Sequence, residues 1–146
     1  MATPPKTVYG SEAEYRAHFV RVYCRGPIVT FDKIPVWFRK RDFDHCMYES
    51  SPMLGRKVSF SRVRAERIDW IKATLENPAS ELFQGWNRKR KRIEPTRRVA
   101  VVYEDFAVVI NVRKTADCTF RAYFVTAYKA ETSISKIRSK PRWKPW

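Results

Sequence analysis

Glycine and histidine are scarce in this chain of 146 residues, and their scarcity narrows the chemistry open to it. With only four glycines, a Gly-rich loop that cradles phosphates through backbone amides is almost excluded. Only two histidines, His18 and His45, are available for proton transfer near neutral pH. The P-loop, GxSxG and HExxH motifs are absent from the sequence. Few side chains of this sequence are therefore candidates for catalytic groups.

Cysteine pairs, carboxylate clusters and long apolar runs are also missing. Cys24, Cys46 and Cys118 are odd in number and far apart, so they form neither a zinc-ligand pattern nor a disulfide framework. This cysteine usage suits a reducing cytosol, and we expect a cytoplasmic protein. Residues 1–9 lack the apolar core of a signal peptide, and no apolar run approaches the roughly 18 residues of a membrane span. The scattered acidic residues offer no cluster for two-metal phosphoryl chemistry, so we expect no metal, no cofactor and no membrane partner.

Acidic residues are outnumbered two to one. Fifteen Asp and Glu face thirty Lys and Arg, which gives a formal net charge of +15. A folded domain with this charge repels itself, and a polyanion relieves the repulsion. Nucleic acid is the first candidate partner, and an anionic membrane surface or an acidic protein is the second.

The N-terminal half shows helical patterns. Ser11 opens a capping box, and aromatic residues recur at helical spacing along residues 12–25. A second helix is predicted for residues 59–76, where an Asn-Pro pair ends the apolar periodicity. Residues 39–58 are expected to be mostly loop, with a helical turn near His45. The short apolar runs nearby fit either strands or a packed loop.

The C-terminal half changes to strand-like patterns, with β-branched and aromatic runs separated by short polar turns. Such connections favour antiparallel pairing. We therefore predict an α+β fold in which N-terminal helices pack on a C-terminal antiparallel sheet of about four strands. One domain is expected over residues 11–132, between a flexible arm at 1–10 and a basic irregular tail at 133–146. The predicted core contains Phe60, Ile68, Ile71, Val101, Val109 and Val125.

Cleavage of RNA without a metal needs few protein groups. The ribose 2′-OH attacks its own phosphate, a base and an acid move protons, and cations meet the developing charge. His45 is the better placed histidine, because it lies in a polar segment next to basic residues, whereas a packed or a surface role is expected for His18. Arg64 and Arg67 lie in or beside the apolar face of the second predicted helix, where a charge needs a partner. Arg113 and Arg121 flank the last predicted turn. From the residues alone, each of these four arginines is interpreted as a solvated charge or a phosphate anchor rather than as a catalytic group.

The order of pieces along residues 43–130 is distinctive. A polar histidine precedes a helix that carries an arginine and ends near an Asn-Pro pair, and the last strand reads Val-Thr-Ala-Tyr. This order resembles the barnase–EndoU–colicin E5/D–RelE superfamily of small ribonucleases, in particular its phage-encoded and toxin-like branches. The resemblance implies an RNA-cutting domain with helices packed on an antiparallel sheet. The active-site residues that it implies are His45, Arg64, Thr126 and Tyr128.

Three functional hypotheses follow. The first is a metal-independent endoribonuclease, as a toxin or phage-defence effector, with RNA as substrate and an acidic antitoxin or immunity protein as a further partner. The second is a non-catalytic RNA- or DNA-binding module that uses a basic ribbon and exposed aromatic residues. The third is a protein whose basic face docks an acidic protein. The predicted nucleic-acid-binding residues are Arg88, Lys89, Arg90, Lys91, Arg92, Arg97, Arg98 and Arg113.

Overall fold

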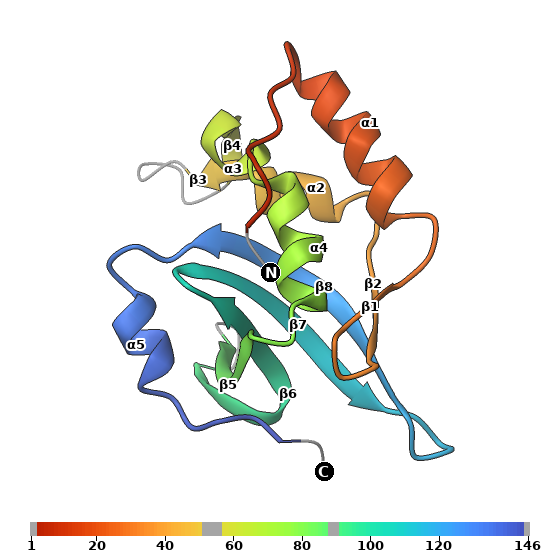
Figure 1. Cartoon of the computed structure of the whole chain (residues 1–146), viewed down its shortest axis with the longest axis vertical. Helices are drawn as coiled ribbons and strands as arrows, with labels where there is room; N and C mark the ends of the chain where they lie inside the picture. Colours follow the sequence, from red (N-terminus) through yellow and green to blue (C-terminus); the bar gives the residue numbers. More distant parts are fainter. Residues whose placement is uncertain (1–2, 51–56, 88–90, 145–146) are drawn as a thin grey trace.

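A six-stranded sheet in the order β1-β2-β8-β7-β6-β5 forms the frame of the fold (Figure 1). The computed structural model describes residues 3–50, 57–87 and 91–144. From β5 to β8, each strand pairs antiparallel with the next, as the short connections require. The strands are β1 (Ile28–Val29), β2 (Pro35–Trp37), β5 (Glu81–Asn87), β6 (Arg92–Tyr103), β7 (Phe106–Lys114) and β8 (Phe120–Lys129).

The α+β class is confirmed, but the expected four strands were too few. Two N-terminal strands extend the sheet, since β2 pairs in parallel with β8 and β1 pairs antiparallel with β2. These strands are the apolar runs for which the sequence left strand and packed loop open. The outer edge of β8 has backbone N–H and C=O groups that a further strand can pair with. The two short apolar runs are strands in the structure because this edge gives them a partner.

The helices and a second, two-stranded sheet lie mainly above the large sheet in Figure 1. Residues 59–76 do not form one helix, because Phe60 pairs with Tyr48 in the small sheet and the helix restarts after a break at residues 66–67. Residues 39–58, expected to be mostly loop, contain both a helix and a strand. The elements are α1 (Glu12–Tyr23), α2 (Asp42–Met47), β3 (Tyr48–Ser50), β4 (Lys57–Phe60), α3 (Arg62–Ala65), α4 (Ile68–Glu76) and α5 (Ile134–Arg138).

The main core lies between the helices and one face of the large sheet. Ile68, Ile71 and Val101 are buried there as predicted, while Phe60 is only partly buried against the cluster. Val109 is half-buried, because it pairs with Ala100 and Thr126 on the opposite face of the sheet. Val125 is also half-buried, and it lies opposite the irregularity in the β7–β8 register.

The opposite face of the sheet has a smaller core under α5. Ala100, Val102 and Ala107 are buried there, with Ile134 and Ile137 of α5 packed against them. Residues 133–146 were expected to form an irregular tail, but they contain the helix α5. Its two isoleucines are three residues apart and so lie on one side of the helix, which packs on the sheet. The tail also returns to the sheet edge, where the backbone N–H of Trp143 donates to the carbonyl of Leu82 at 3.0 Å.

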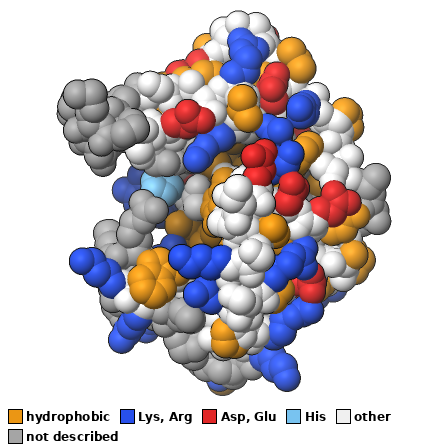
Figure 2. All heavy atoms as spheres, turned by 90° about the vertical axis from the view of Figure 1, so that its left-hand side faces the viewer, with side chains coloured by type: hydrophobic (Ala, Val, Ile, Leu, Met, Phe, Trp, Pro, Cys, Tyr) orange, Lys and Arg blue, Asp and Glu red, His pale blue; other side chains and the backbone are white. Residues whose placement is uncertain are grey.

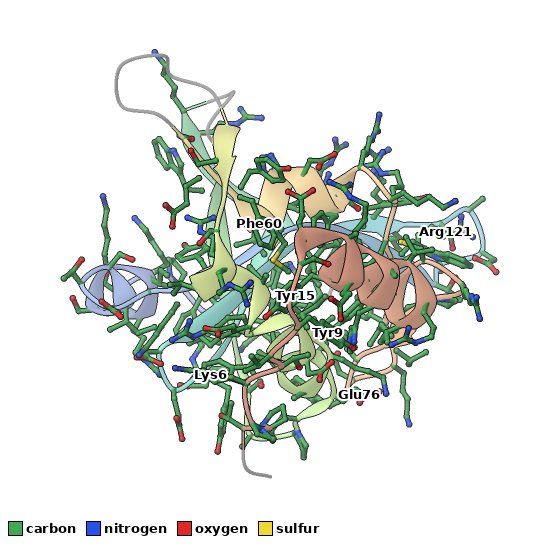
Figure 3. All side chains as sticks on the ribbon, turned by 90° about the horizontal axis from the view of Figure 1, so that it is seen from above. Lys6, Tyr9, Tyr15, Phe60, Glu76 and Arg121 are labelled. Atoms are coloured by element: carbon green, nitrogen blue, oxygen red, sulfur yellow. The ribbon has the colours of Figure 1, made fainter. Side chains whose placement is uncertain are left out.

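The N-terminal arm is held against the helices over its described residues. The Thr7 N–H donates to the Glu66 carbonyl at 2.7 Å, and the indole N–H of Trp70 donates to the Pro4 carbonyl at 2.7 Å. Tyr9 packs edge-on against Tyr15, with 5.1 Å between ring centroids (Figure 3). The segment expected to be a flexible arm therefore forms part of the packed structure.

His18 belongs to a polar network that joins this arm to α4. The residue is 8% exposed, with Nδ1 2.8 Å from the Tyr9 hydroxyl and Nε2 2.7 Å from Asp69 Oδ1. Thr7 donates to the other Asp69 oxygen at 2.8 Å. Buried polar groups need such partners, and of the packed and surface roles left open for His18, the structure shows the packed one.

Tyr23 provides a test of the contact between α1 and α4. Its buried hydroxyl donates to the Ile68 carbonyl at 2.5 Å and accepts from the Lys72 N–H at 3.0 Å. Tyr23→Phe should lower the free energy of unfolding by about 1–3 kcal/mol, the cost of leaving buried hydrogen-bonding groups unsatisfied. Urea denaturation of this variant and of Tyr123→Phe, at a half-buried position, measures the difference. Equal losses in the two variants would contradict the role assigned to the Tyr23 hydroxyl.

Candidate functional site

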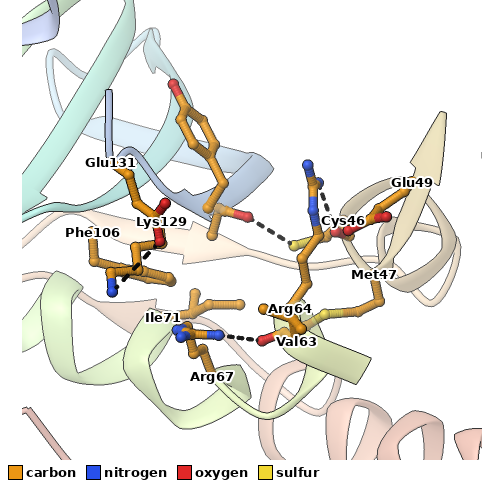
Figure 4. Close-up of a pocket in the computed structure, with 12 residues that line it drawn as sticks. Cys46, Met47, Glu49, Val63, Arg64, Arg67, Ile71, Phe106, Lys129 and Glu131 are labelled. Atoms are coloured by element: carbon orange, nitrogen blue, oxygen red, sulfur yellow. Dashed lines mark hydrogen bonds and ion pairs between the residues drawn. The ribbon is translucent and has the colours of Figure 1, made fainter. Parts of the chain in front are cut away.

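A cavity of about 270 Å³ opens where the end of α2, the α3–α4 segment and the end of β8 meet (Figure 4). The face of the molecule that lies on the left in Figure 1 has a hollow in its surface, and Lys and Arg side chains lie around this hollow (Figure 2). The floor is partly apolar, whereas the walls carry three basic and two acidic side chains. The lining residues are Cys46, Met47 and Glu49, then Val63, Arg64, Arg67 and Ile71, and finally Phe106, Ala127, Tyr128, Lys129 and Glu131.

Arg64 joins α3 to the end of α2. Its Nη1 donates to the carbonyl of Cys46 at 3.3 Å, while its backbone N–H is capped by Ser61 Oγ at 3.3 Å. Carbonyl groups at a helix C-terminus carry partial negative charge and attract a cation. Among the residues that the structure describes, no carboxylate forms an ion pair with Arg64. Its guanidinium can therefore take an external anion.

Cys46 fixes α2 to the edge of β8, because its Sγ donates to the Ala127 carbonyl at 3.5 Å (Figure 4). Its thiol is almost fully buried. The sequence predicted no role for this cysteine, since a lone cysteine matches no metal or disulfide pattern. The contact brings the end of α2 beside Ala127 and Tyr128, two residues of the predicted Val-Thr-Ala-Tyr motif.

Arg67 lies deeper in the same cavity. Its side chain is 9% exposed, its Nη1 donates to the Val63 carbonyl at 2.5 Å, and its guanidinium lies 5.1 Å from the centroid of the Trp70 ring. Its Nε is buried and has no hydrogen-bond partner. The sequence marked Arg67 as a charge that needs a partner but did not assign it to the site. A cation on the apolar face of a helix is the sequence signal by which Arg67 could have been assigned to the site.

The remaining charges of the cavity are Glu49, Lys129 and Glu131. Glu49 accepts a hydrogen bond from Ser61 at 2.9 Å. Lys129 lies 3.7 Å from Glu131 and 3.8 Å from Asp105, so its charge is shared between two carboxylates. The two arginines are therefore the cations of the cavity that lack carboxylate partners within the described residues.

His45 is exposed on α2, one residue before Cys46, and it is not among the residues that line the cavity. Successive helical residues are turned by about 100°. Cys46 faces β8, and His45 falls on the flank of the helix next to it, on the same side as Asp42 at i−3. Asp42 is buried and accepts from the Arg39 N–H at 2.8 Å, and burial raises the pKa of its carboxyl above the ordinary value.

Thr126 and Tyr128 lie toward the face of the sheet that carries α5. Thr126 is paired with Val109, which pairs with Ala100 of the smaller core, and cross-strand partners share a face. Tyr128 packs against that core and also borders the cavity. Of the four predicted catalytic residues, the structure brings Arg64 and Tyr128 to one cavity. Thr126 and His45 are outside its lining, on two elements that adjoin it.

The predicted basic ribbon belongs to the β5–β6 hairpin. Lys91, Arg92 and Arg97 are exposed, and Arg98 is half-buried. Arg98 packs over Gly85, where a Cβ would lie 2.5 Å from the Arg98 Cγ, so this position needs glycine. The predicted ribbon residues Arg88, Lys89 and Arg90 lie outside the described residues.

Arg113 and Arg121, the two arginines at the far end of the β7–β8 hairpin, are both exposed and pair across it. The Arg113 guanidinium lies 5.8 Å from the centroid of the Tyr123 ring. Tyr123 in turn pairs with Trp37, which is 39% exposed. This end of the sheet thus combines arginines with aromatic rings.

The comparisons with known proteins add no relative. No family model, no curated protein and no solved structure matches this chain. Within residues 3–50, 57–87 and 91–144, no helix is both long and apolar enough to cross a membrane. Over the same ranges, no group of three His, Cys, Asp or Glu side chains is placed to hold a metal ion.

The buried carboxyl of Asp42 predicts a pH effect on stability. Because its folded-state pKa is raised, the native state binds the proton more tightly than the unfolded chain does, and the contribution of Asp42 becomes less favourable as pH rises from about 3.9 through the folded pKa. Asp42→Asn keeps an oxygen for the Arg39 N–H and removes the buried charge. This variant should be more stable than the wild type at pH 7, with the gap closing toward about pH 4. Urea midpoints from pH 3.5 to 7 measure it, and a pH-independent difference would contradict the assignment.

Proposed function

We propose that this chain is a metal-independent endoribonuclease whose active site lies where α2, α3 and the end of β8 meet. The observation that carries the proposal is Arg64, a cation without a carboxylate partner among the described residues, held at the end of α2 in a cavity that Tyr128 also borders. A cation in this state suits the charge that builds on phosphoryl oxygens during strand cleavage.

His45 supplies the proton-transfer group in this proposal. It is exposed and lies one residue before Cys46, which contacts β8 and lines the cavity. A general base removes the proton from the ribose 2′-OH as the new 2′-oxygen–phosphorus bond forms, and a general acid protonates the 5′-oxygen as its bond to phosphorus breaks. We assign one of these transfers to His45, with the hydroxyl groups of Thr126 and Tyr128 as additional donors. DNA has no 2′-OH and should bind without being cut.

The biological setting is proposed from the superfamily resemblance. A small basic ribonuclease of this kind acts as a toxin or phage-defence effector in the cytoplasm. The net charge of +15 favours RNA as the substrate, and an acidic antitoxin or immunity protein would complement the same charge.

The decisive experiment uses one RNA oligonucleotide in EDTA. Cleavage by the wild type should survive the chelator, and His45→Ala should lower the rate by about 10²- to 10⁴-fold, the scale of losing a general acid–base group. RNA binding should change little, because phosphate contacts supply most of the affinity. Equal cleavage by the two proteins would rule out His45.

Arg64→Ala should also reduce the cleavage rate. Arg25→Ala is its matched control, since Arg25 is an exposed arginine just beyond α1 and outside the cavity lining. Melting temperatures measured beside the rates separate a loss of catalysis from a loss of folded protein. If the wild type is folded and cuts no RNA, the binding module becomes the better description.

One observation favours that second function, a non-catalytic nucleic-acid-binding module. Trp86 on β5 is 52% exposed on the hairpin that carries the basic ribbon, and exposed aromatic rings beside cations stack on unpaired bases. Both functions need the ribbon to contact phosphates, so its contribution is testable by itself.

Replacing Lys91, Arg92 and Arg97 together with glutamine should weaken RNA binding and flatten its salt dependence. Each phosphate contact on a single strand contributes about −0.7 to the slope of log K against log salt, so losing three contacts should reduce the slope by about 2. Titrations at several salt concentrations measure this. An unchanged slope would remove the ribbon from the interface.

A further inference from the structure

The deepest charged group of the cavity is a cation that the proposed reaction does not use. Arg67 is nine-tenths buried, yet its Nε has no hydrogen-bond partner. Among the described residues, the Arg67 guanidinium makes one hydrogen bond, from Nη1 to the Val63 carbonyl, and lies over the Trp70 ring. These neutral partners do not balance its charge, and a buried charge without a counter-ion destabilises the fold, so a purely structural arginine is a poor explanation for this geometry.

Arg64 lies in the same cavity, three positions before Arg67 in the chain, and also has no carboxylate partner within the described residues. The acidic groups of the cavity are engaged elsewhere, since Glu49 accepts from Ser61 and Glu131 lies against Lys129. In Figure 4, the Arg64 side chain extends beside Cys46, whereas that of Arg67 lies nearer Ile71 and Phe106. The two guanidinium groups therefore approach the cavity from different depths.

We propose that this cavity binds one phosphate group, with Arg67 as its ligand. Guanidinium groups donate in a planar fork that matches phosphate oxygens. The volume of about 270 Å³ leaves ample room for a phosphate group.

The inference rests on the cavity of the proposed function and deepens it. If the chain cuts RNA, Arg67 holds a phosphate of the strand and thereby positions the neighbouring nucleotide beside His45. Arg67 is then a positioning residue, and its loss should raise KM more than it lowers kcat.

The binding test uses inorganic phosphate as the probe, with chloride and acetate at matched ionic strength as references. Calorimetry of the wild-type protein should detect phosphate binding, and its melting temperature should rise in phosphate above either reference, by mass action. Arg67→Gln should weaken phosphate binding by at least about tenfold, which corresponds to losing a hydrogen bond to a charged group. Arg25→Gln, which removes the same charge outside the cavity, should bind phosphate like the wild type.

A stability measurement distinguishes a ligand-binding arginine from a structural one. Arg67→Met should be at least as stable as the wild type in chloride, because it removes a buried, unpaired charge. In phosphate the order should reverse, since only the wild type gains from the ligand. A structural arginine would give the same loss in both buffers, and that result would overturn the inference.

Competition identifies the source of the phosphate. An all-deoxy oligonucleotide, which the proposed reaction cannot cut, should displace inorganic phosphate if the cavity holds a strand phosphate, while phosphate bound without competition indicates a small free ligand. An equal response to phosphate, acetate and chloride would refute the inference, and a response to acetate alone would assign the cavity to a carboxylate of an acidic protein. Phosphate binding without RNA cleavage would leave this inference standing and refute only the proposed ribonuclease.

Discussion

The outer edge of β8 is the constraint on which the rest of the structure depends. Along its first half, residues 122 and 123 pair in parallel with β2. Along its second half, the edge carbonyl of Ala127 instead accepts from the thiol of Cys46, so α2 takes the position that a further strand would occupy. An unpaired strand edge must be covered, and here a strand covers its first half and a helix its second half. The change of cover at mid-strand places the end of α2 and its polar flank beside the Val-Thr-Ala-Tyr segment.

Arg64 and Arg67 have no carboxylate partner among the described residues, although other polar groups that join the helices and the arm do. Around His18, for example, the imidazole contacts the Tyr9 hydroxyl and the Asp69 carboxylate, which also accepts from Thr7. Arg64 on α3 and Arg67 at the break before α4 depart from that pattern together, in one cavity. In a protein with a net charge of +15, adjacent unneutralised cations raise the self-repulsion further. Two such departures at one place are more readily explained by binding an anion than by folding.

The sequence predicted those parts of the fold that depend on local periodicity. The helix at residues 12–25 and the sequential strands of the C-terminal half follow from spacing alone. Strands β1 and β2 could not be predicted from spacing, because two- and three-residue runs become strands only when a long partner such as β8 offers its edge. The tail helix α5 was missed because its two isoleucines are too few for a periodic signal. For the site, the motif order named Arg64 and Tyr128, which line one cavity, and also Thr126, which shares the face of Tyr128 but lies two residues farther from the end of β8 and outside the lining. A strand pattern by itself leaves open which of its residues reach such a cavity.

The break between α3 and α4 lies where two arginines interrupt the apolar face of the predicted helix. On a continuous helix over residues 59–76, Arg64 and Arg67 would each stand four residues before Ile68 and Ile71, which puts both charges on the apolar face. A continuous helix would have to bury both in the core against the sheet. The chain breaks the helix at residues 66–67 instead, caps the first piece with Ser61 and leaves a cavity where the two guanidinium groups project. The break therefore leaves both arginines beside the apolar core, in the lining of the cavity rather than between the helix and the sheet.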